Sequence, residues 1–188
     1  MLQEAGVKKI LKRRKELVES RVAFSKQSEE AISKIYRNID IIIYDIDIEL
    51  DKFVNNSNIG KWLLQIKGMS VDIVAGILAY FSVDEIDCAA QFISFVGLYD
   101  NNKPHNKTAR EFINMAVSNF ISLKDESYYY KIMCKSFNEI NERAINYISK
   151  IFVAHIFEKM YLEAHHHPPE KDGRDGNYVV EPEIPYTR

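Results

Sequence analysis

The chain has 188 residues, 46% of them hydrophobic, which excludes a largely disordered protein and is enough to build a folded core. Its net charge of −2 excludes a uniformly basic coat for nucleic acid, but it allows a local basic patch. Apolar runs stay short of the roughly 20 uncharged residues that a membrane-spanning helix needs. We therefore expect no membrane association.

Cysteine use indicates a reducing compartment. Cys88 and Cys134 lie in apolar helical contexts, and their spacing is not that of metal ligands. We expect both to be reduced thiols within the core. No signal peptide is recognisable, so the sequence predicts a cytoplasmic protein that holds neither a metal nor another cofactor.

The stretch from Leu2 to about Asn55 predicts a helical arm. In the second half of this stretch apolar residues recur at alternating steps of three and four, the seam of a coiled coil, whereas the first half is less regular. The apolar residues of the arm are Leu17, Val18, Phe24, Ile32, Ile35, Ile39, Ile42, Ile46, Leu50 and Phe53. Polar residues 25–28 are the best place for a break, so a single long helix and a helical hairpin are both open.

A dense basic cluster lies near the start of this arm. Its members are Lys8, Lys9, Lys12, Arg13, Arg14 and Lys15. Such a cluster can contact the phosphates of DNA or of a guide RNA. The solvated face of a coiled coil gives the same pattern, so both interpretations stay open.

An acidic stretch follows on the arm at residues 41–50, IIIYDIDIEL. Asp45, Asp47 and Glu49 alternate there with apolar residues, which is the periodicity of a strand. A strand with these carboxylates would suit a metal-dependent nuclease. The coiled-coil pattern continues on both sides, however, and no later strands complete a sheet. We therefore predict a helix with a solvated acidic face and place the nuclease hypothesis last.

Residues 61–98 organise the rest of the chain. One apolar segment ends just before Gly68 and another follows it at helical spacing, which predicts a helix, a tight turn and a second helix. Glycine suits the turn because it takes a positive φ at no steric cost. We expect Ser70 to cap the second helix, whose first amides would bind phosphate as in a helix-hairpin-helix. Lys61 and Lys67 flank this turn and would reach the same phosphate backbone.

A polar loop at residues 99–107, YDNNKPHNK, is the second candidate binding region. It follows a short helix, predicted over residues 87–96, that Gly97 ends. Lys103, His105, Lys107 and Arg110 form a local basic group in and after this loop. Phosphate binding and an ordinary solvated turn explain this group equally well.

Three further helices are predicted, over residues 106–123, 125–137 and 144–163, and the last of them closes a bundle. Tyr128, Tyr129 and Tyr130 suggest base stacking. Helical geometry spreads them around the axis, so we favour packing in the core and at its rim. Three consecutive histidines at 165–167 point in different directions and read as a frayed helix end rather than a metal site.

Three motifs, in this order, resemble the C-terminal domain of one transposase family. They are Ile66-Lys67-Gly68-Met69-Ser70, then Ala75 and Leu78, then Phe92-Ile93-Ser94-Phe95-Val96-Gly97-Leu98. The family comprises insertion-sequence recombinases with an N-terminal RuvC-like nuclease fold and a C-terminal helical domain carrying a serine, together with the Piv-type DNA invertases. It usually shows I-P-G-I-G, an alanine-rich helix and A-x-Y-A-G-L. Here Lys67 stands in place of the proline and Ser70 in place of the second glycine.

The resemblance extends from about Leu11 to about Glu163. Residues 17–21, LVESR, are similar to the L-V-E-E-R that opens the family's coiled-coil arm. Since that arm joins protomers in the family, the resemblance implies a homodimer through the coiled coil. It also implies DNA as a partner, with a guide RNA as a further candidate.

The resemblance limits what catalysis to expect. In the family the polar loop is longer and glycine-rich, and it carries the serine proposed to attack the DNA backbone. Here the loop contains no serine, although residues 103–107 match the family's K-R-G-N-K step. The nuclease fold that would supply Mg-binding carboxylates is also absent, because the sequence starts at the arm. We therefore assign no catalytic residue and leave open whether the chain is an enzyme.

Together these patterns predict an all-α protein in three parts. Residues 1–56 form a coiled-coil arm, residues 57–164 a compact helical domain with a helix-hairpin-helix, and residues 165–188 a tail. The function expected is that of a DNA-binding protein of the transposase lineage, a truncated or degenerate copy without independent catalysis. The alternative is a non-catalytic coiled-coil interaction protein.

Overall fold

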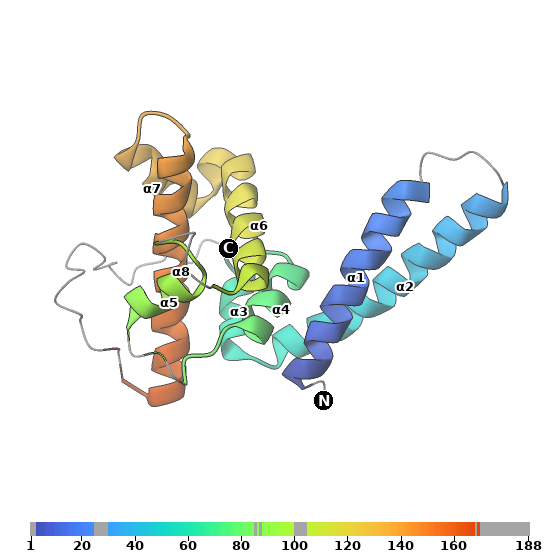
Figure 1. Cartoon of the computed structure of the whole chain (residues 1–188), viewed down its shortest axis with the longest axis horizontal. Coiled ribbons are helices and arrows are strands. Elements are labelled where there is room, and N and C mark those ends of the chain that lie inside the picture. Colours follow the sequence, from blue (N-terminus) through green and yellow to red (C-terminus); the bar gives the residue numbers. More distant parts are fainter. Residues whose placement is uncertain are drawn as a thin grey trace.

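The computed structural model describes residues 3–24, 30–84, 86, 88–99, 105–167 and 169. Within these residues the chain forms eight α-helices and one short 3-10 helix, with no strand, which confirms the predicted all-α class (Figure 1). Three expectations fall outside the described residues: the break at residues 25–28, Lys103 in the polar loop, and nearly all of the tail.

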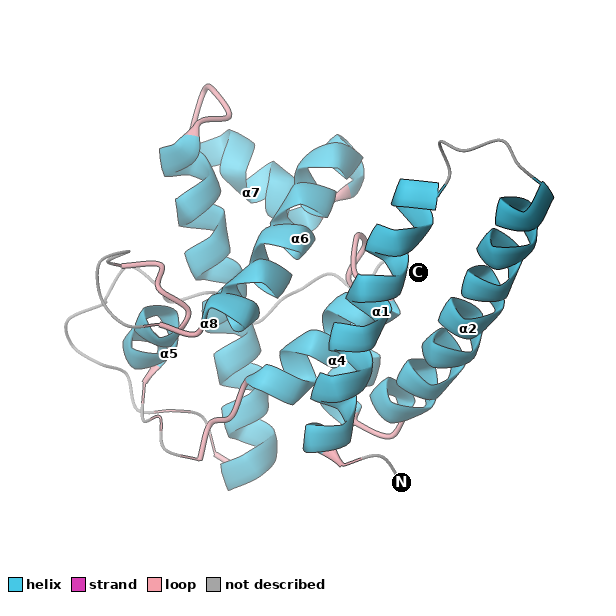
Figure 2. Ribbon diagram, turned by 45° about the vertical axis from the view of Figure 1, so that its right-hand side comes forward, coloured by secondary structure: helices cyan, strands magenta, loops and turns pink. Residues whose placement is uncertain are grey.

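The arm is a helical hairpin rather than a single rod. Helix α1 (Glu4–Phe24) and helix α2 (Glu30–Asn55) lie side by side and run in opposite directions (Figures 1 and 2). Arg21 links them, because its Nε lies 2.5 Å from Asp40 Oδ1. The acidic stretch 41–50 lies entirely within α2, so the helix prediction is confirmed and the strand alternative was wrong.

The base of the arm is part of the main hydrophobic core. Val7 and Leu11 from α1 and Leu50 and Val54 from α2 are buried in the same cluster as the helical domain. They pack where the hairpin meets α4 (Val71–Tyr80), which contacts both arm helices. The arm is therefore anchored at one end.

The helical domain is built around α8 (Glu142–His165), which is buried almost continuously from Ile148 to Phe157. Helices α3 (Asn58–Leu64), α5 (Ala89–Phe95), α6 (Lys107–Leu123) and α7 (Tyr128–Ser136) all contact it. The 3-10 helix η1 (Lys124–Glu126) joins α6 to α7. Aromatic rings dominate this core: Tyr129 and Phe120 stack with centroids 4.7 Å apart, and Phe152 meets both edge-on.

Side-chain caps set where most of the domain's helices begin. Ser57, Asn106, Ser127 and Asn141 each accept a hydrogen bond from the backbone amide three residues further on. This satisfies one of the amides that a helix start leaves without a partner.

Two local predictions have different outcomes. Tyr129 is fully buried while Tyr128 and Tyr130 are half-buried, which confirms packing in the core and at its rim. The expectation of core thiols was wrong: Cys88 is half-buried and Cys134 is exposed, both as free thiols. Helix α7 buries Met133, and the next residue points about 100° away from that face. Among the described helices none combines the length and hydropathy needed to cross a membrane.

Candidate functional site

The predicted glycine turn lies between α3 and α4. Gly68 has a φ of 98°, a conformation that side-chain-bearing residues rarely adopt, so this part of the prediction is confirmed. The turn is packed against the last turns of α6. Asn119 donates its side-chain amide to the Gly68 carbonyl at 2.8 Å, and a Cβ at Gly68 would lie 3.1 Å from atoms of Phe120 and Leu123.

The start of α4 does not have the cap that the sequence predicts. Ser70 occupies the N-cap position, but its hydroxyl donates to Asp72 Oδ1 at 2.5 Å instead of accepting from a backbone amide. A hydrogen bond to a charged carboxylate is stronger than one to a neutral group, and this bond orients the Ser70 hydroxyl toward Asp72. Asp72 lies in the first turn, where its negative charge complements the helix dipole. The amide end of α4 therefore already has an anion of its own.

The two lysines beside this turn are both exposed. Lys67 Nζ lies 3.2 Å from Glu126 Oε2 of η1. Lys61 lies on α3, one helix earlier, and is exposed. An exposed ion pair contributes little stability, so Lys67 can exchange Glu126 for another anion at small cost.

The basic cluster of the arm is largely used within the protein. Arg14 joins three helices: it binds Asp47 of α2 at 2.6 Å and Asp72 of α4 at 3.0 Å. Burial by itself lowers the pKa of Arg14, but the hydrogen bond with Asp47 and the charges of Asp72 and Asp47 leave that pKa raised. Lys15 pairs with Glu111 of α6 at 3.0 Å.

Other members of that cluster divide between internal contacts and solvent. Arg13 pairs with Glu16 on its own helix, and Lys8 lies over the ring of Tyr80 at 5.1 Å. Lys9 and Lys12 are exposed. The cluster therefore offers only part of its charge to an external phosphate.

The carboxylates of the nuclease hypothesis do not gather into a metal site. Asp47 is paired with Arg14, and Glu49 accepts from Lys52 at 2.7 Å. No group of three or more histidine, cysteine or acidic residues in the described part of the chain could hold a metal ion.

A second glycine corner lies at the end of α5. Gly97 has a φ of 71°, and the amides of Gly97 and Leu98 bond back to the carbonyls of Ser94 at 2.9 Å and Ile93 at 3.1 Å. This is the Schellman arrangement, which confirms that Gly97 ends the helix.

The chain returns to this corner after the polar loop. The Asn106 amide donates to the Phe95 carbonyl at 2.9 Å, and Arg110 donates to the carbonyl of Gly97. The imidazole of His105 lies directly over Gly97, where a Cβ would come within 2.5 Å of its Cγ. His105 and Arg110, two of the predicted phosphate-binding residues, therefore meet at one point.

The start of α6 differs from the start of α4 in charge. Asn106 caps it by accepting from the Ala109 amide at 3.0 Å, and its first turn has no acidic residue. Lys107 is the first residue of the helix and is exposed. The partial positive charge of this helix end is reinforced by Lys107 and Arg110.

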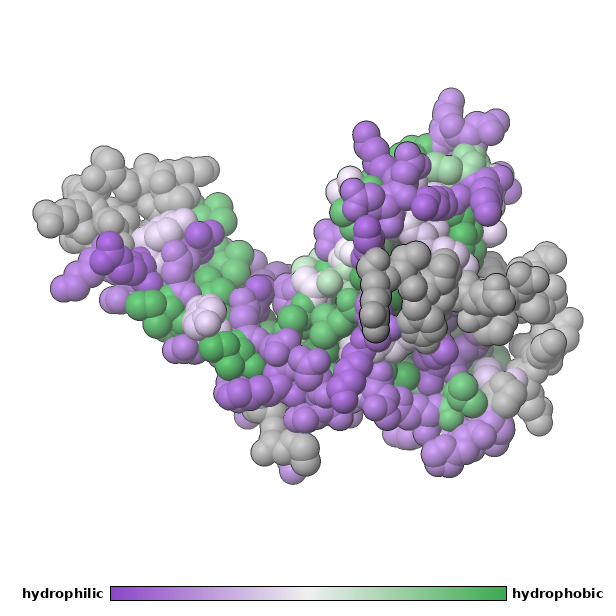
Figure 3. All heavy atoms as spheres, turned by 180° about the vertical axis from the view of Figure 1, so that it is seen from behind, coloured by the Kyte–Doolittle hydropathy of each residue, from purple (hydrophilic) through white to green (hydrophobic). Residues whose placement is uncertain are grey.

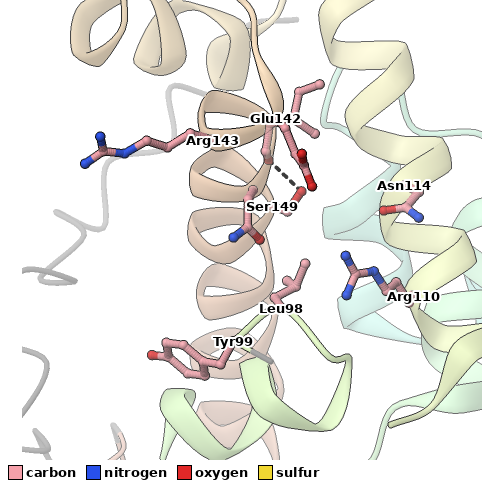
Figure 4. A pocket seen from close by; sticks show the side chains of 9 residues that line it. Leu98, Tyr99, Arg110, Asn114, Glu142, Arg143 and Ser149 are labelled. Carbon is pink, nitrogen blue, oxygen red and sulfur yellow. Dashed lines mark hydrogen bonds between the residues drawn. The ribbon is translucent and has the colours of Figure 1, made fainter. Parts of the chain in front are cut away.

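A cleft of about 380 Å³ opens beside this helix start, between α6 and α8. Its lining residues are Leu98, Tyr99, Arg110, Asn114, Glu142, Arg143, Ile145, Asn146 and Ser149. Figure 4 shows Arg110 and Asn114 extending from α6 toward α8, with Glu142 on the opposite wall. The hydroxyl of Ser149 donates to the Ile145 carbonyl at 2.8 Å.

The structure separates the two groups of predicted phosphate ligands. Gly68 packs on Asn119 near the end of α6, whereas Arg110 is near its beginning, about 14 Å away along the helix axis. Sequence reasoning found Arg110 but missed Asn114, Glu142 and the residues of α8 in the cleft. Their spacing in the sequence does not indicate a shared site, because the two walls of the cleft come from distant parts of the chain.

A buried polar pair lies under the Gly68 turn. Tyr129, which stacks on Phe120, has its hydroxyl 2.8 Å from Nδ1 of His155, and the Nε2 of His155 is buried with no hydrogen-bond partner. Burial, with a smaller effect from Lys159, lowers the pKa of His155 to about 4. Burial also raises the pKa of Tyr129, so both groups are neutral near pH 7.

A scan of the chain against protein-family models matched none of them, and a search of curated proteins found no significant match.

Proposed function

We propose that the chain is a non-catalytic DNA-binding protein of the transposase lineage, which holds the sugar-phosphate backbone at the start of α6. One observation carries the location: the first turn of α6 has no carboxylate and has Lys107 and Arg110 beside its free amides. Backbone amides and cations at a helix start are a favourable arrangement for phosphate. The resemblance of the sequence motifs supplies the lineage.

The Gly68 corner is the weaker candidate for the same contact. The carboxylate of Asp72, bound by Arg14, already occupies the start of α4, so an external phosphate would have to compete with it there. Asn119 and the end of α6 cover the glycine itself. Lys67 remains exposed and can still contribute long-range attraction.

We propose no strand-transfer chemistry for the chain on its own. Residues 100–104 contain no hydroxyl side chain, and the serine nearest the cleft, Ser149, is buried and bonded to the Ile145 carbonyl. A serine nucleophile needs an adjacent base and an accessible hydroxyl. Neither accompanies Ser149.

The test is a matched pair of charge reversals measured by fluorescence anisotropy with a short DNA duplex. We expect Lys107→Glu to weaken binding about tenfold or more, and Lys67→Glu to weaken it about twofold, at low salt. Affinity of the natural sequence should fall steeply with salt, because phosphate contacts release counterions. A larger loss for Lys67→Glu would return the contact to the Gly68 corner. Absent or salt-insensitive binding would remove DNA binding altogether.

The alternative function, a coiled-coil interaction protein, is favoured by a specific surface of α2. Ile41, Tyr44 and Ile48 form an apolar stripe at helical spacing and are 54%, 66% and 37% exposed. Figure 3 shows apolar residues interleaved with polar ones along the arm. An apolar stripe along one face of a helix is what a partner helix would cover.

The charges at the ends of the stripe suit a second copy of the chain. Arg37 lies one turn before Ile41 and Asp51 lies one turn after Ile48, both exposed. Antiparallel pairing of two α2 helices would place Arg37 opposite Asp51 of the other copy and bring the two stripes together. We propose this as the route by which the arm forms a homodimer.

Sedimentation velocity tests the pairing. Arg37→Asp should weaken the dimer, and Arg37→Asp combined with Asp51→Arg should restore it, because the reversed charges meet again across the two-fold axis. Lys12→Gln on α1 serves as the control and should have no effect. A monomer at all concentrations, or a dimer indifferent to both changes, would contradict this proposal without bearing on DNA binding.

A further inference from the structure

We infer that the cleft between α6 and α8 receives one unpaired nucleotide of the bound DNA. The inference rests on the proposed function and specifies the DNA structure that this same site would accept. The first observation is the position of the cleft: Arg110, one turn after the start of α6, is one of its lining residues.

The size of the cleft suits one base and its sugar. Its volume of about 380 Å³ lies at the small end of ligand pockets in proteins. It is open to solvent along one side, and its two walls are helices (Figure 4). A double helix cannot enter such a space, whereas a single nucleotide turned out of the stack can.

The polar lining has the groups that read the edge of a base. Asn114 from α6 and Asn146 from α8 each present a carboxamide, which donates and accepts at once. Carboxamides pair with adenine in this way, and a carboxylate such as Glu142 accepts from an exocyclic amino group. Arg110 and Arg143 also line the cleft and would attract an anion, but a free inorganic anion would leave the carboxamide oxygens and the Glu142 carboxylate without a donor, whereas the edge of a base supplies one.

The remaining lining suits the faces of a base. Leu98, which is buried, and Ile145 supply an apolar surface; Tyr99 also lines the cleft, with its ring turned away from α6 (Figure 4). The Nζ of Lys150 lies 4.5 Å from the centroid of the Tyr99 ring, which holds that ring against α8. Stacking on an aromatic side chain contributes about 1–3 kcal/mol per base and tolerates any base.

The phosphate of the same nucleotide has a partner nearby. Lys107 precedes Arg110 by one turn, and Arg110 is oriented by its hydrogen bond to the Gly97 carbonyl. The backbone can therefore lie across the start of α6 while the base enters between the helices. Both parts of one nucleotide are bound by one continuous surface.

The experiment compares two duplexes that differ only in one base. The first has a single bulged adenosine and the second has an abasic site in the same bulge, so the number of phosphates is equal. We expect the adenosine bulge to bind about tenfold more tightly in fluorescence anisotropy. Asn114→Leu and Asn146→Leu should each reduce that ratio toward one, with the affinity for the abasic bulge unchanged.

Met115→Leu is the matched control, because Met115 is exposed on α6 outside the cleft lining. It should keep the tenfold ratio. Equal binding of the two bulges by the natural sequence, or a ratio that persists in both asparagine variants, would overturn the inference while leaving DNA binding intact. Binding to neither duplex would instead overturn the proposed function and this inference with it.

Discussion

The corners at Gly68 and Gly97 are alike in sequence and different in what surrounds them. In each, a glycine with positive φ follows one helical segment, and the start of another helix lies close by. That helix is α4, after Ser70, at the first corner and α6, after Asn106, at the second. At Gly68 the protein supplies its own anion, Asp72, and covers the turn with the end of α6. At Gly97 the following helix starts with Lys107 and opens on a cleft.

The comparison shows that a glycine turn predicts backbone geometry while its surroundings set the local charge. A carboxylate in the first turn of a helix already complements the helix dipole, so such a helix start should favour an external phosphate less. That condition depends on a single residue, Asp72 in one corner and none in the other. The difference can be tested by changing each corner in turn.

The largest expected effect is the pH dependence of stability that comes from His155, in the buried Tyr129–His155 pair beneath the Gly68 corner. The pKa of His155 is about 4 in the folded protein and about 6.5 in an unfolded chain, so the unfolded state binds more protons between these values. The contribution of neutral His155 to the free energy of unfolding is therefore complete above pH 6.5. It falls by about 3 kcal/mol as the pH drops to 4. Urea unfolding at pH 7 and pH 4.5 measures it.

His155→Phe is the control for that measurement. It should flatten the pH dependence relative to the natural sequence, whatever its effect on stability at pH 7. An unchanged pH dependence would mean that His155 does not provide the acid sensitivity of this layer.

Replacing each glycine with alanine should destabilise the two corners by different amounts. Gly97→Ala should cost about 2 kcal/mol or more, because the φ is unfavourable and the ring of His105 must move. Gly68→Ala should cost about 1–2 kcal/mol, since the φ is also unfavourable there but the nearest atoms, in Leu123 and Phe120, are 3.1 Å away instead of 2.5 Å. Thermal unfolding of the two variants gives the order, and a larger loss at Gly68 would contradict it.

Removing the internal anion should make the corners more alike. Asp72→Asn takes a partner from Arg14 and a charge from the start of α4, so we expect a loss of about 1–2 kcal/mol in stability. The same change should raise duplex affinity at low salt by a few fold. Glu126→Gln, which releases Lys67 without altering α4, is the matched control. Unchanged affinity in Asp72→Asn would show that Asp72 is not what excludes phosphate.

The smallest expected difference is in the stability lost when the N-cap residues of α6 and α4, Asn106 and Ser70, are replaced by alanine. Asn106→Ala should cost about 1 kcal/mol, because its side chain bonds the Ala109 amide. Ser70→Ala should cost only a few tenths of that, since the Ser70 hydroxyl bonds Asp72 rather than an amide. Equal losses in thermal unfolding would mean that Ser70 caps α4 in solution.

Local features of the fold were predictable because they depend on neighbours in sequence. The turns at Gly68 and Gly97 and the helical state of residues 41–50 follow from backbone preference and apolar spacing. The failures came from competition between nearby groups. The Ser70 hydroxyl bonds the nearby carboxylate of Asp72, and Cys134 faces outward because its neighbour Met133 takes the buried face of α7.

The candidate site was only half predictable, because its walls are far apart in sequence. Lys107 and Arg110 stood out as cations near a polar loop. Asn114 and Asn146 gave no signal, since a polar residue on a helix is ordinarily a solvated one. The arrangement of three helices around Arg14 was equally invisible, because the pairs Arg14–Asp47 and Arg14–Asp72 join residues from different elements.

The bonds of Arg14 add a polar link to the hydrophobic anchor of the arm. One guanidinium joins α1, α2 and α4 where the base of the hairpin is buried against α4, so the arm is attached to the domain by both packing and ion pairs. If two copies pair arm to arm as proposed, this attachment would hold their two clefts at a fixed separation and would favour DNA sites at a matching spacing.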